Sequence, residues 1–415
     1  MNQYVIIGNA IAAVGCIEGI RSIDKEGKIT VLSAEPHPAY CRPLISYYLE
    51  DKTTLQNMSY RPESFYEEQN CRVFYSVKAQ VIDVRKKKVK SSEGTWISYD
   101  KLCVATGSSP FVPPMEGLDT VEHPFSFMTL DDALDLEKAL RPDSRVLIVG
   151  AGLIGLKCAE GIRNKVKSLT ICDLADRIMP SILDTEAAAM VQRHLEEHGM
   201  EFLLGDTAAR FEGNKAVMKS GKTVEFDLLV LAVGVRPNSQ IVKDACGEVN
   251  RGIVTDEHMR TTLPDIYAAG DCVESYDISG DRHMVMAIFP NAYMQGYAAG
   301  VNMAGGEERF DHGIPMNSIG FFGLHTITAG SYFTQEQGGT LYEEKGENTL
   351  KRLFTKDGYL TGFMLIGDIE RAGIYTSLVR ERIALEEIDF ELIRKSPSLM
   401  AFGKDYRGRK LGGVV

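Results

Sequence analysis

The chain has 415 residues, with 46 lysines and arginines against 57 aspartates and glutamates, so its formal net charge is −11. Its length predicts about two or three domains, and a hydrophobic content of 44% is enough for buried cores. The acidic balance argues against nucleic acid and anionic membrane surfaces as partners, because both need clustered lysine and arginine. No apolar run approaches the roughly 20 residues that a membrane helix needs.

The pattern of cysteines and the N-terminal sequence indicate the cellular compartment in which the protein is expected. The eight cysteines contain no C-x-x-C pair and no spacing typical of a metal site, and several lie inside apolar runs. The N-terminus lacks the positive start of a secretory signal and leads directly into an apolar strand. We therefore expect a cytoplasmic protein with reduced thiols and no metal site.

Two segments of the chain are built alike. The first has an apolar strand at residues 4–7, a turn at Gly8, a helix, a second strand at residues 29–32 and then Glu35. This order of strand, glycine turn, helix, strand and acidic residue is typical of the start of a dinucleotide-binding βαβ unit.

The second segment repeats this order, with strands at residues 145–150 and 169–172, a glycine-rich turn, a helix and then Asp173. Both units also close alike, because residues 99–107 and 226–234 each read as an aromatic residue, an aspartate, a buried strand and a glycine. The sequence therefore predicts a duplicated architecture.

Beyond about residue 313 the pattern changes to short alternating strands at residues 350–355 and 360–366, followed by a helix at residues 371–381. Proline-marked turns at Pro113 and Pro237 bound the second unit. We expect an α/β protein with two Rossmann-like dinucleotide-binding domains, the second inserted in the first, plus a small α+β C-terminal domain. The expected bounds are 1–112 with 238–312 for the first domain, 113–237 for the second and 313–415 for the third.

The second unit carries a complete G-x-G-x-x-G fingerprint. Gly150 makes the tight turn, Gly152 lets the backbone approach a pyrophosphate, and Gly155 lets the helix pack on the strand. A carboxylate at Asp173 binds ribose hydroxyls and repels a 2′-phosphate, which favours NADH over NADPH, although the nearby Arg177 acts against this preference. The expected NAD contacts are Gly150, Gly152, Ile154, Gly155, Asp173 and Gly234.

The first fingerprint is degenerate, because Ala10 and Ala13 stand where the second and third glycines are expected. One added methyl group at each position is tolerable if the pyrophosphate lies slightly further out. Glu35 supports the assignment as a ribose-binding acid.

Together with Ala105-Thr106-Gly107, residues 234–238 and the Ala269-Gly270-Asp271 segment, the two fingerprints resemble the pyridine nucleotide–disulfide oxidoreductase superfamily of flavoproteins. The resemblance implies that the first fold binds FAD, that the inserted fold binds NAD(P)H, and that Asp271 holds the ribityl chain of FAD. The implied FAD contacts are Gly8, Ala10, Ala13, Glu35, Arg42, Pro43, Ala79, Ala105, Thr106, Gly107, Asp271, Asn291 and Ala292.

Within this superfamily the chain most resembles NADH-dependent rubredoxin and ferredoxin reductases and the flavin module of NADH-dependent nitrite reductases. The similar segments are residues 35–44, 290–296 and 362–375. The C-x4-C redox disulfide and the His-Pro-Glu motif of the dithiol enzymes are missing. The resemblance therefore implies electron transfer without a protein dithiol.

Two positions expected beside the flavin depart from the related reductases. Those enzymes carry a lysine after the Arg-Pro loop and a glutamate after the second fingerprint, whereas this chain has Tyr47 and Lys157 there. Lys157 either stabilises negative charge on reduced flavin or is a solvated lysine on a helix surface. Both interpretations stay open.

Cys41 lies near the position of the redox thiol of NADH oxidases and coenzyme A disulfide reductases, but one residue away from it. A structural and a redox role both remain possible. We expect the other seven cysteines to be small buried hydrophobic residues. The basic residues Lys404, Arg407, Arg409 and Lys410 either dock an acidic iron–sulfur carrier or are solvated.

The function expected from these features is that of an FAD-dependent NADH oxidoreductase that passes electrons to a small carrier such as rubredoxin or ferredoxin. One alternative is an NADH oxidase or a peroxide or disulfide reductase that uses Cys41, and the other is a non-enzymatic FAD/NAD-binding scaffold. The candidate catalytic residues are Lys157, Tyr47 and Cys41. The chain is expected to act as a monomer or a homodimer.

Overall fold

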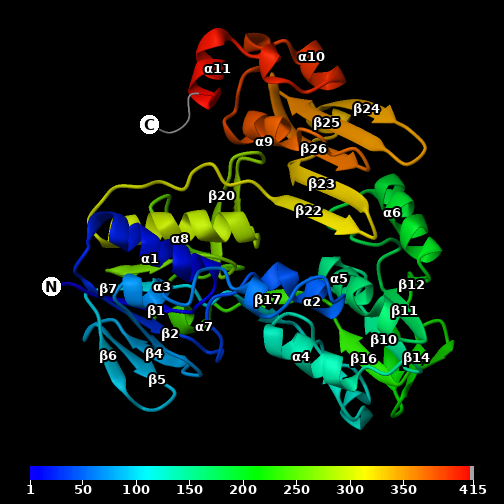
Figure 1. Cartoon of the computed structure of the whole chain (residues 1–415), viewed down its shortest axis with the longest axis horizontal. Helices are drawn as coiled ribbons and strands as arrows, with labels where there is room; N and C mark the ends of the chain where they lie inside the picture. Colours follow the sequence, from blue (N-terminus) through cyan, green and yellow to red (C-terminus); the bar gives the residue numbers. More distant parts are fainter. Residues whose placement is uncertain (412–415) are drawn as a thin grey trace.

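The computed structural model describes residues 1–411 and contains three regions (Figure 1). The first is a five-stranded parallel sheet of order β19-β7-β1-β2-β3, covered on one face by helices α1 and α8 and packed on the other against the antiparallel sheet β4-β5-β6 (Figure 1). Its elements are β1 (Gln3–Ile7), α1 (Ile11–Ile23), β2 (Lys28–Leu32), β3 (Cys71–Phe74), β4 (Ala79–Asp83), β5 (Lys88–Ser91), β6 (Trp96–Ser98), β7 (Lys101–Val104), β19 (Ile266–Ala268) and α8 (Phe289–Met303).

The second region is another five-stranded parallel sheet, of order β12-β11-β10-β16-β9, accompanied by the antiparallel sheet β13-β14-β15. Its elements are β9 (Pro124–Phe125), α4 (Leu130–Ala139), β10 (Arg145–Val149), α5 (Leu153–Ile162), β11 (Ser168–Asp173), α6 (Thr185–Glu197), β12 (Glu201–Leu204), β13 (Ala208–Phe211), β14 (Lys215–Met218), β15 (Thr223–Glu225) and β16 (Leu228–Leu231).

The two sheets have the same topology. Each places its opening strand, β1 or β10, in the centre, with the next two parallel strands on one side and the closing strand, β7 or β16, on the other. The same hydrogen bond anchors both closing strands: the Gln3 amide donates to the Asp100 carboxylate at 2.7 Å, and the Arg145 amide donates to Asp227 at 2.7 Å. The predicted duplication is confirmed down to single contacts.

The first glycine of each loop is in the same strained environment. Gly8 and Gly150 have φ angles of +111° and +116°, which L side chains rarely adopt. An added Cβ would lie 2.0 Å from the carbonyl oxygen of Ala105 at Gly8 and 2.2 Å from that of Ala232 at Gly150. The closing strand of each unit therefore requires glycine at the opening turn.

Helices α1 and α8 pack at backbone contact distance. An added Cβ at Gly15 would lie 2.3 Å from the carbonyl oxygen of Tyr293, and one at Gly296 would lie 2.0 Å from that of Ala12. Small residues on both helices thus bring the start of α8 beside the first glycine loop. This close approach joins two segments almost 300 residues apart in the sequence.

The chain crosses between the two nucleotide folds twice, at adjacent positions. Strands β8 (Ser108–Pro110) and β17 (Val235–Pro237) form an antiparallel ladder, and the Asn238 amide donates to the Gly107 carbonyl at 2.9 Å. This arrangement agrees with insertion of the second fold into the first. The exact domain bounds stay a prediction.

The third region is a five-stranded antiparallel sheet of order β22-β23-β26-β25-β24 with helices beside it (Figure 1). Phe363, Tyr375 and Leu378 lie at the centre of its core. The predicted domain reaches residue 415, but its last four residues lie outside the described part. The elements are β22 (Met316–Phe321), β23 (Leu324–Gly330), β24 (Thr340–Lys345), β25 (Leu350–Lys356), β26 (Tyr359–Ile366), α9 (Ala372–Arg380), α10 (Phe390–Lys395) and α11 (Lys404–Leu411).

Short elements connect these regions: α2 (Ile45–Leu49), α3 (Phe65–Glu68), α7 (Gln240–Asp244), β18 (Ile253–Val254), β20 (Val273–Asp277) and β21 (Arg282–Met284), with single turns of 3-10 helix between them. Within residues 1–411, no helix has both the length and the apolar character needed to cross a membrane. The predicted α/β fold with two Rossmann-like units is confirmed.

The expectation that seven cysteines are buried hydrophobic residues is wrong for two of them. Cys246 is exposed, and Cys71 is only partly buried. Cys246 has a φ of +66°, so it lies at a surface turn and not inside a packed element. Both cysteines have polar or charged residues within two positions on each side in the sequence, unlike those that lie inside apolar runs.

Candidate active site

The glycine loop of the second fold presents open backbone. Gly155 cannot carry a side chain, because an added Cβ would lie 2.0 Å from the carbonyl oxygen of Gly150. At Gly152, the residue before α5, no atom lies within 4 Å of that position, and the same holds at Gly234. Ile154 is partly exposed in the first turn of α5. Because helix N-terminal amides bind phosphate, this loop fits the pyrophosphate of a dinucleotide.

The Asp173 carboxylate lies at the same loop. Its two oxygens accept hydrogen bonds from the amides of Ala151 at 2.7 Å and Ala175 at 2.8 Å. Arg177, which could have favoured a 2′-phosphate, instead pairs with Asp176 at 2.9 Å. Arg177 therefore does not neutralise the carboxylate that is predicted to bind ribose.

The loop of the first fold is held by its neighbours. Ala10 precedes α1, and Ala13 is fully buried at the place that Gly155 takes in the second fold. Gly107 has a φ of +66° and no atom within 4 Å of an added Cβ, so its backbone also faces open space. The Thr106 hydroxyl donates to the carbonyl of Asn238 at 2.7 Å.

Arg42 brings together residues predicted to contact FAD. Its guanidinium donates to Glu35 at 2.7 Å, and the other oxygen of Glu35 accepts the Tyr40 hydroxyl at 2.7 Å. Burial raises the pKa of the Asp271 carboxyl, and a hydrogen bond from Ser108 and the positive charge of Arg42 oppose that rise. The positive charge of Arg42 thus acts on both Glu35 and Asp271.

The segment around Asp271 is joined to the start of α8. The Gly270 amide donates to the Gln295 side-chain oxygen at 2.8 Å, and the Gln295 amide donates to the Ser275 hydroxyl at 2.9 Å. Gly270 has a φ of +85°, and an added Cβ there would lie 3.1 Å from Ala12. Two separately predicted motifs therefore meet at one point.

The other predicted FAD contacts differ in exposure. Pro43 is exposed and Ala79 is partly exposed at the start of β4, whereas Ala105 and Ala292 are buried. Asn291 is fully buried, and its amide donates to the Ile314 carbonyl at 3.0 Å. Its side-chain amide faces the segment that leads to the third region, and the predicted contact of Asn291 with FAD stays a prediction.

Lys157 and Tyr47 come together between the two nucleotide folds. The Lys157 ammonium nitrogen lies 4.8 Å from the centre of the Tyr47 ring and 5.5 Å from that of Phe321. It also donates to the Glu160 carboxylate and, at 3.2 Å, to the Gly320 carbonyl. The Lys157 side chain is only 15% exposed, so the interpretation of a solvated surface lysine is wrong.

Cys41 precedes the short 3-10 turn that contains Arg42 and is partly buried. Burial raises the pKa of its thiol, and a hydrogen bond with the Leu44 backbone opposes that rise. A raised pKa lowers the fraction of nucleophilic thiolate. All eight cysteines, which lie within the described residues, are free.

Sequence reasoning missed the groups that hold Lys157. Glu160 lies one helical turn further along α5, and this spacing was a usable signal because residues three apart on a helix are neighbours. Gly320 and Phe321 come from the third region, and no local pattern connects them with α5. Tyr40, whose hydroxyl donates to Glu35, lies in the similar segment at residues 35–44, and its sequence context indicated no role.

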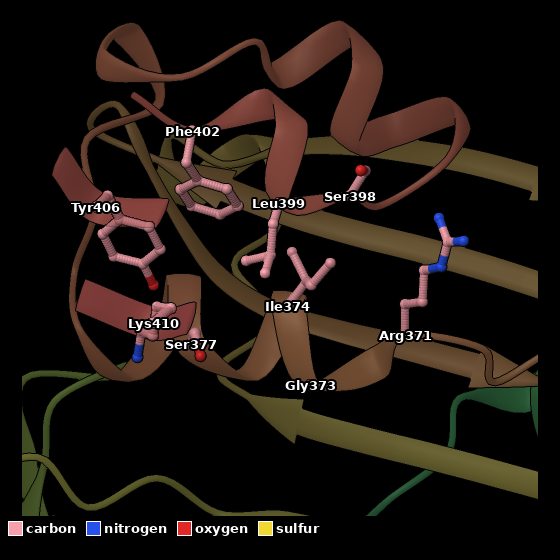
Figure 2. Close-up of a pocket in the computed structure, with 9 residues that line it drawn as sticks. All are labelled: Arg371, Gly373, Ile374, Ser377, Ser398, Leu399, Phe402, Tyr406 and Lys410. Atoms are coloured by element: carbon pink, nitrogen blue, oxygen red, sulfur yellow. The ribbon is translucent and has the colours of Figure 1, made fainter. Parts of the chain in front are cut away.

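A surface groove of about 540 Å³ lies in the third region (Figure 2). Apolar side chains of Ile374, Leu399, Phe402 and Tyr406 line it, and Lys410 is at one end (Figure 2). Lys410 pairs with Glu381 and is one of four basic residues on α11. The groove shares no residue with the predicted cofactor contacts. No group of three or more histidine, cysteine or acidic side chains suited to a metal occurs in residues 1–411.

The sequence profile of the pyridine nucleotide-disulphide oxidoreductase family matches residues 2–296, which is more than half of the chain. The chain belongs to this family. It is therefore a flavin-dependent NAD(P)H oxidoreductase, and FAD and NADH are the cofactors of the family. The open glycine loops, Asp173 and Asp271 fit these two dinucleotides. The predicted assignment of each single contact stays a prediction.

Relatives of similar length support this assignment. The chain is 32% identical over 393 residues to the NADH-dependent phenylglyoxylate dehydrogenase subunit epsilon of Aromatoleum evansii, covering 92% of each chain. It is 29% identical to an NADH oxidase of Methanocaldococcus jannaschii, covering 93% of each. A nitric oxide reductase FlRd-NAD(+) reductase of Salmonella agona is 32% identical over 65% of this chain and 72% of that protein.

Other relatives are much longer. The chain is 29% identical to the nitrite reductase [NAD(P)H] of Bacillus subtilis but spans only 48% of its length. Among solved structures, the covalent putidaredoxin reductase–putidaredoxin complex matches with a TM-score of 0.87 at 21% identity, covering 100% of this chain and 99% of the other. That likeness establishes the fold.

Proposed function

We propose that this protein oxidises NADH and passes the electrons through FAD to a small protein carrier of the rubredoxin or ferredoxin type. The relative from Salmonella agona, whose name describes a reductase of a flavorubredoxin, supports the class of acceptor. The observation that carries the proposal is the Lys157–Tyr47 contact, which puts a fixed cation between the two nucleotide folds where related reductases use a lysine and a glutamate.

FAD, when bound, accepts a hydride from NADH and releases electrons to the acceptor. The residues of this chain bind and orient the two dinucleotides. The open backbone at Gly152 would receive the pyrophosphate of NADH, the backbone at Gly107 would contact FAD, and Asp271 would accept hydrogen bonds from the ribityl hydroxyls of FAD. Glu35 and Arg42 would bind the adenosine end of FAD.

Lys157 supplies electrostatic stabilisation. Its ammonium group lies in a partly dry site, between aromatic rings and against a buried carboxylate, so it acts in a low-dielectric environment on negative charge that develops beside it. Tyr47 is 36% exposed, and its phenol can donate a hydrogen bond without adding charge. Together they substitute for the lysine–glutamate pair.

Asp173 sets the preference for NADH. Its carboxylate is fixed by two backbone amides at the end of β11, where it would accept hydrogen bonds from the ribose hydroxyls of the adenosine. A 2′-phosphate placed there would meet like charge, and Arg177 is engaged by Asp176. Discrimination against NADPH follows from this repulsion.

The acceptor is either a diffusing carrier or a permanently bound subunit. The name of the Aromatoleum evansii relative, a subunit epsilon, supports a subunit arrangement. The basic residues of α11 offer a complementary surface for an acidic iron–sulfur protein in either case. Co-purification at high ionic strength distinguishes the two, because a diffusing carrier held by surface charge dissociates there.

A second candidate function is that of an NADH oxidase or disulfide reductase that uses Cys41. The relative from Methanocaldococcus jannaschii favours it, because that protein is named an NADH oxidase. The raised pKa of the Cys41 thiol speaks against a nucleophilic role.

Anaerobic titration with NADH tests the proposed function. We expect the FAD-loaded protein to be reduced stoichiometrically by NADH and reoxidised rapidly by rubredoxin or ferredoxin. Oxygen and coenzyme A disulfide are the comparison acceptors. Faster reoxidation by either of these than by the two carriers would assign the protein to the second candidate function, and no reduction by NADH would contradict both.

A further inference from the structure

Glu160 is a buried carboxylate that joins the second nucleotide fold to the third region. Its side chain is 3% exposed and lies on α5. One oxygen accepts the Lys157 ammonium group, and the other accepts the Phe322 amide at 2.8 Å. A carboxylate this deeply buried needs such partners, because burial of an unpaired charge is strongly unfavourable.

The Phe322 amide belongs to a strained hairpin tip. Phe321 pairs with Leu324, so Phe322 and Gly323 form a two-residue turn, with φ angles of +45° and +90°. Positive φ at both positions is typical of a type I′ turn, which favours asparagine and glycine. A phenylalanine there persists only where neighbouring groups hold it in place.

Three contacts with the second nucleotide fold hold this tip. The Phe322 ring stacks on His198 with the centres 4.4 Å apart and the planes 4° from parallel. The Phe321 carbonyl lies 3.0 Å from the His194 ring nitrogen. The third contact is the hydrogen bond from the Phe322 amide to Glu160. Strand β22 accordingly extends beside α6 in Figure 1.

The same tip also contacts the cation. The Gly320 carbonyl accepts Lys157 at 3.2 Å, and the Phe321 ring lies 5.5 Å from its nitrogen. Glu160 therefore contacts both the cation and the turn that surrounds it. Within residues 1–411, no other carboxylate forms an ion pair with Lys157.

We propose that Glu160 is the positioning residue for Lys157, and that through it the hairpin of residues 320–323 becomes part of the electron-transfer site. This inference rests on the proposed function of Lys157. Glu160 fixes the ammonium group against the Gly320 carbonyl and beside Tyr47, and it holds the turn that closes this side of the site. A flexible lysine would otherwise sample many positions, and a preorganised charge stabilises developing charge better than a mobile one.

The test compares four variants of the FAD-loaded full-length chain. Glu160→Gln removes the charge and keeps the shape, and Glu160→Asp keeps the charge but shortens the side chain. Lys157→Met and the double variant Lys157→Met/Glu160→Gln complete a double-mutant cycle. Glu186→Gln is the matched control, because Glu186 also bridges to the third region, through Lys345 and Arg352, without contacting Lys157.

Two measurements are needed. The first is the rate of flavin reduction by NADH in stopped flow. The second is hydrogen exchange at residues 320–324, measured with and without FAD, which reports the hairpin and does not depend on activity. We expect both Glu160 variants to slow the reduction of flavin by NADH about tenfold. This factor corresponds to the free energy of one hydrogen bond to a charged group. Both should also speed exchange at the hairpin, whereas Glu186→Gln should do neither.

In the cycle, the double variant should be no slower than Lys157→Met alone, because both the carboxylate of Glu160 and the hairpin that it holds affect the rate by fixing Lys157. Additive losses would overturn the proposal, since Glu160 would then act independently. Wild-type rates for Glu160→Asp would also overturn it, because charge alone would suffice. If Lys157→Met is slow and Glu160→Gln is not, this inference fails and the proposed function stands. If Lys157→Met reduces normally, the proposed role of Lys157 fails first.

Discussion

The ammonium nitrogen of Lys157 lies 4.8 Å from the centre of the Tyr47 ring, between the two nucleotide folds. Lys157 comes from the middle of α5 and Tyr47 from α2, and they lie 110 positions apart in the chain. The related reductases carry the lysine after the Arg-Pro loop and a glutamate on the helix after the second fingerprint. In this chain the lysine lies on that helix, α5, and a tyrosine follows the loop.

The first prediction concerns this pair. Lys157→Met removes the charge and keeps most of the stem, so the reduction potential of bound flavin should fall, and NADH should reduce it roughly 10- to 100-fold more slowly. Lys157→Glu should be slower still, because Glu160 would then face a second carboxylate. Photometric potential titration and stopped flow measure both effects.

A compensating swap checks the same idea. In Tyr47→Lys/Lys157→Glu the cation returns to α2, and the rate should recover relative to Lys157→Glu alone. Tyr47→Phe is the control for the ring, since it keeps the aromatic face and loses only the hydroxyl. Equal rates of flavin reduction in Lys157→Glu and in Tyr47→Lys/Lys157→Glu would contradict the proposal that the two residues act as a pair.

Asp173→Ala should narrow the preference for NADH over NADPH about tenfold or more, because one charge-assisted hydrogen bond is worth ~1.5 kcal/mol. The measurement is kcat/KM for both dinucleotides. Asp143→Ala is the control, because Asp143 is exposed before β10, at the opposite end of the strands. If the ratio of kcat/KM for NADH to that for NADPH is unchanged in Asp173→Ala, Asp173 does not determine the preference for NADH.

Cys41→Ser should leave electron transfer from NADH to an artificial one-electron acceptor within a few-fold of wild type. Burial raises the pKa of the thiol, so it is poorly suited to nucleophilic attack. Cys246→Ser, at an exposed cysteine, is the matched control. A loss of flavin reoxidation on the order of 100-fold, equal to about 2.7 kcal/mol of barrier, would instead place the protein among the thiol-dependent enzymes.

Gly296→Ala should destabilise the protein by about 1–3 kcal/mol, because the added methyl group would lie 2.0 Å from the Ala12 carbonyl oxygen and push α8 from α1. Gly373→Ala on α9 meets no atom within 4 Å and should stabilise by roughly 0.5 kcal/mol. Urea unfolding of both variants, with FAD content measured in parallel, compares them. Equal stability of the two would show that the helices can move apart freely.

Asp271 makes the stability of the FAD-free chain depend on pH. Burial raises the pKa of its carboxyl above the unfolded value of about 3.9, so the folded chain binds the proton more tightly. Stability from this group is present below the unfolded pKa and is lost as pH rises through the folded pKa. Asp271→Asn should therefore unfold at a higher temperature than wild type at neutral pH, while binding FAD about tenfold more weakly.

Thermal unfolding of the FAD-free proteins across this pH range measures the effect. The difference in unfolding temperature between wild type and Asp271→Asn should grow with pH and level off above the pKa of Asp271 in the folded chain. A difference that does not change with pH would mean that the carboxyl has the same pKa in both states. Ser108→Ala, which removes a hydrogen bond to the carboxylate, should enlarge the difference.

The sequence by itself determined the duplicated nucleotide folds and the family, and it predicted cofactor contacts for the acidic residues Glu35, Asp173 and Asp271. Those features depend on strand periodicity, on glycines that only particular turns accept and on short-range spacing, and all of these are visible along the chain. The order of the strands in both sheets and the hydrogen bonds of Asp100 and Asp227, which join residues 97 and 82 positions apart, were shown only by the tertiary structure.

Only the tertiary structure decided what surrounds Lys157. Its neighbours come from two separate parts of the chain, Tyr47 from α2 and Gly320 and Phe321 from β22, and packing brings both to α5. The same holds for Asn291, whose burial depends on the segment at Ile314, and for Cys246, which a surface turn exposes. Residues far apart in sequence meet through side-chain packing, which local periodicity does not encode.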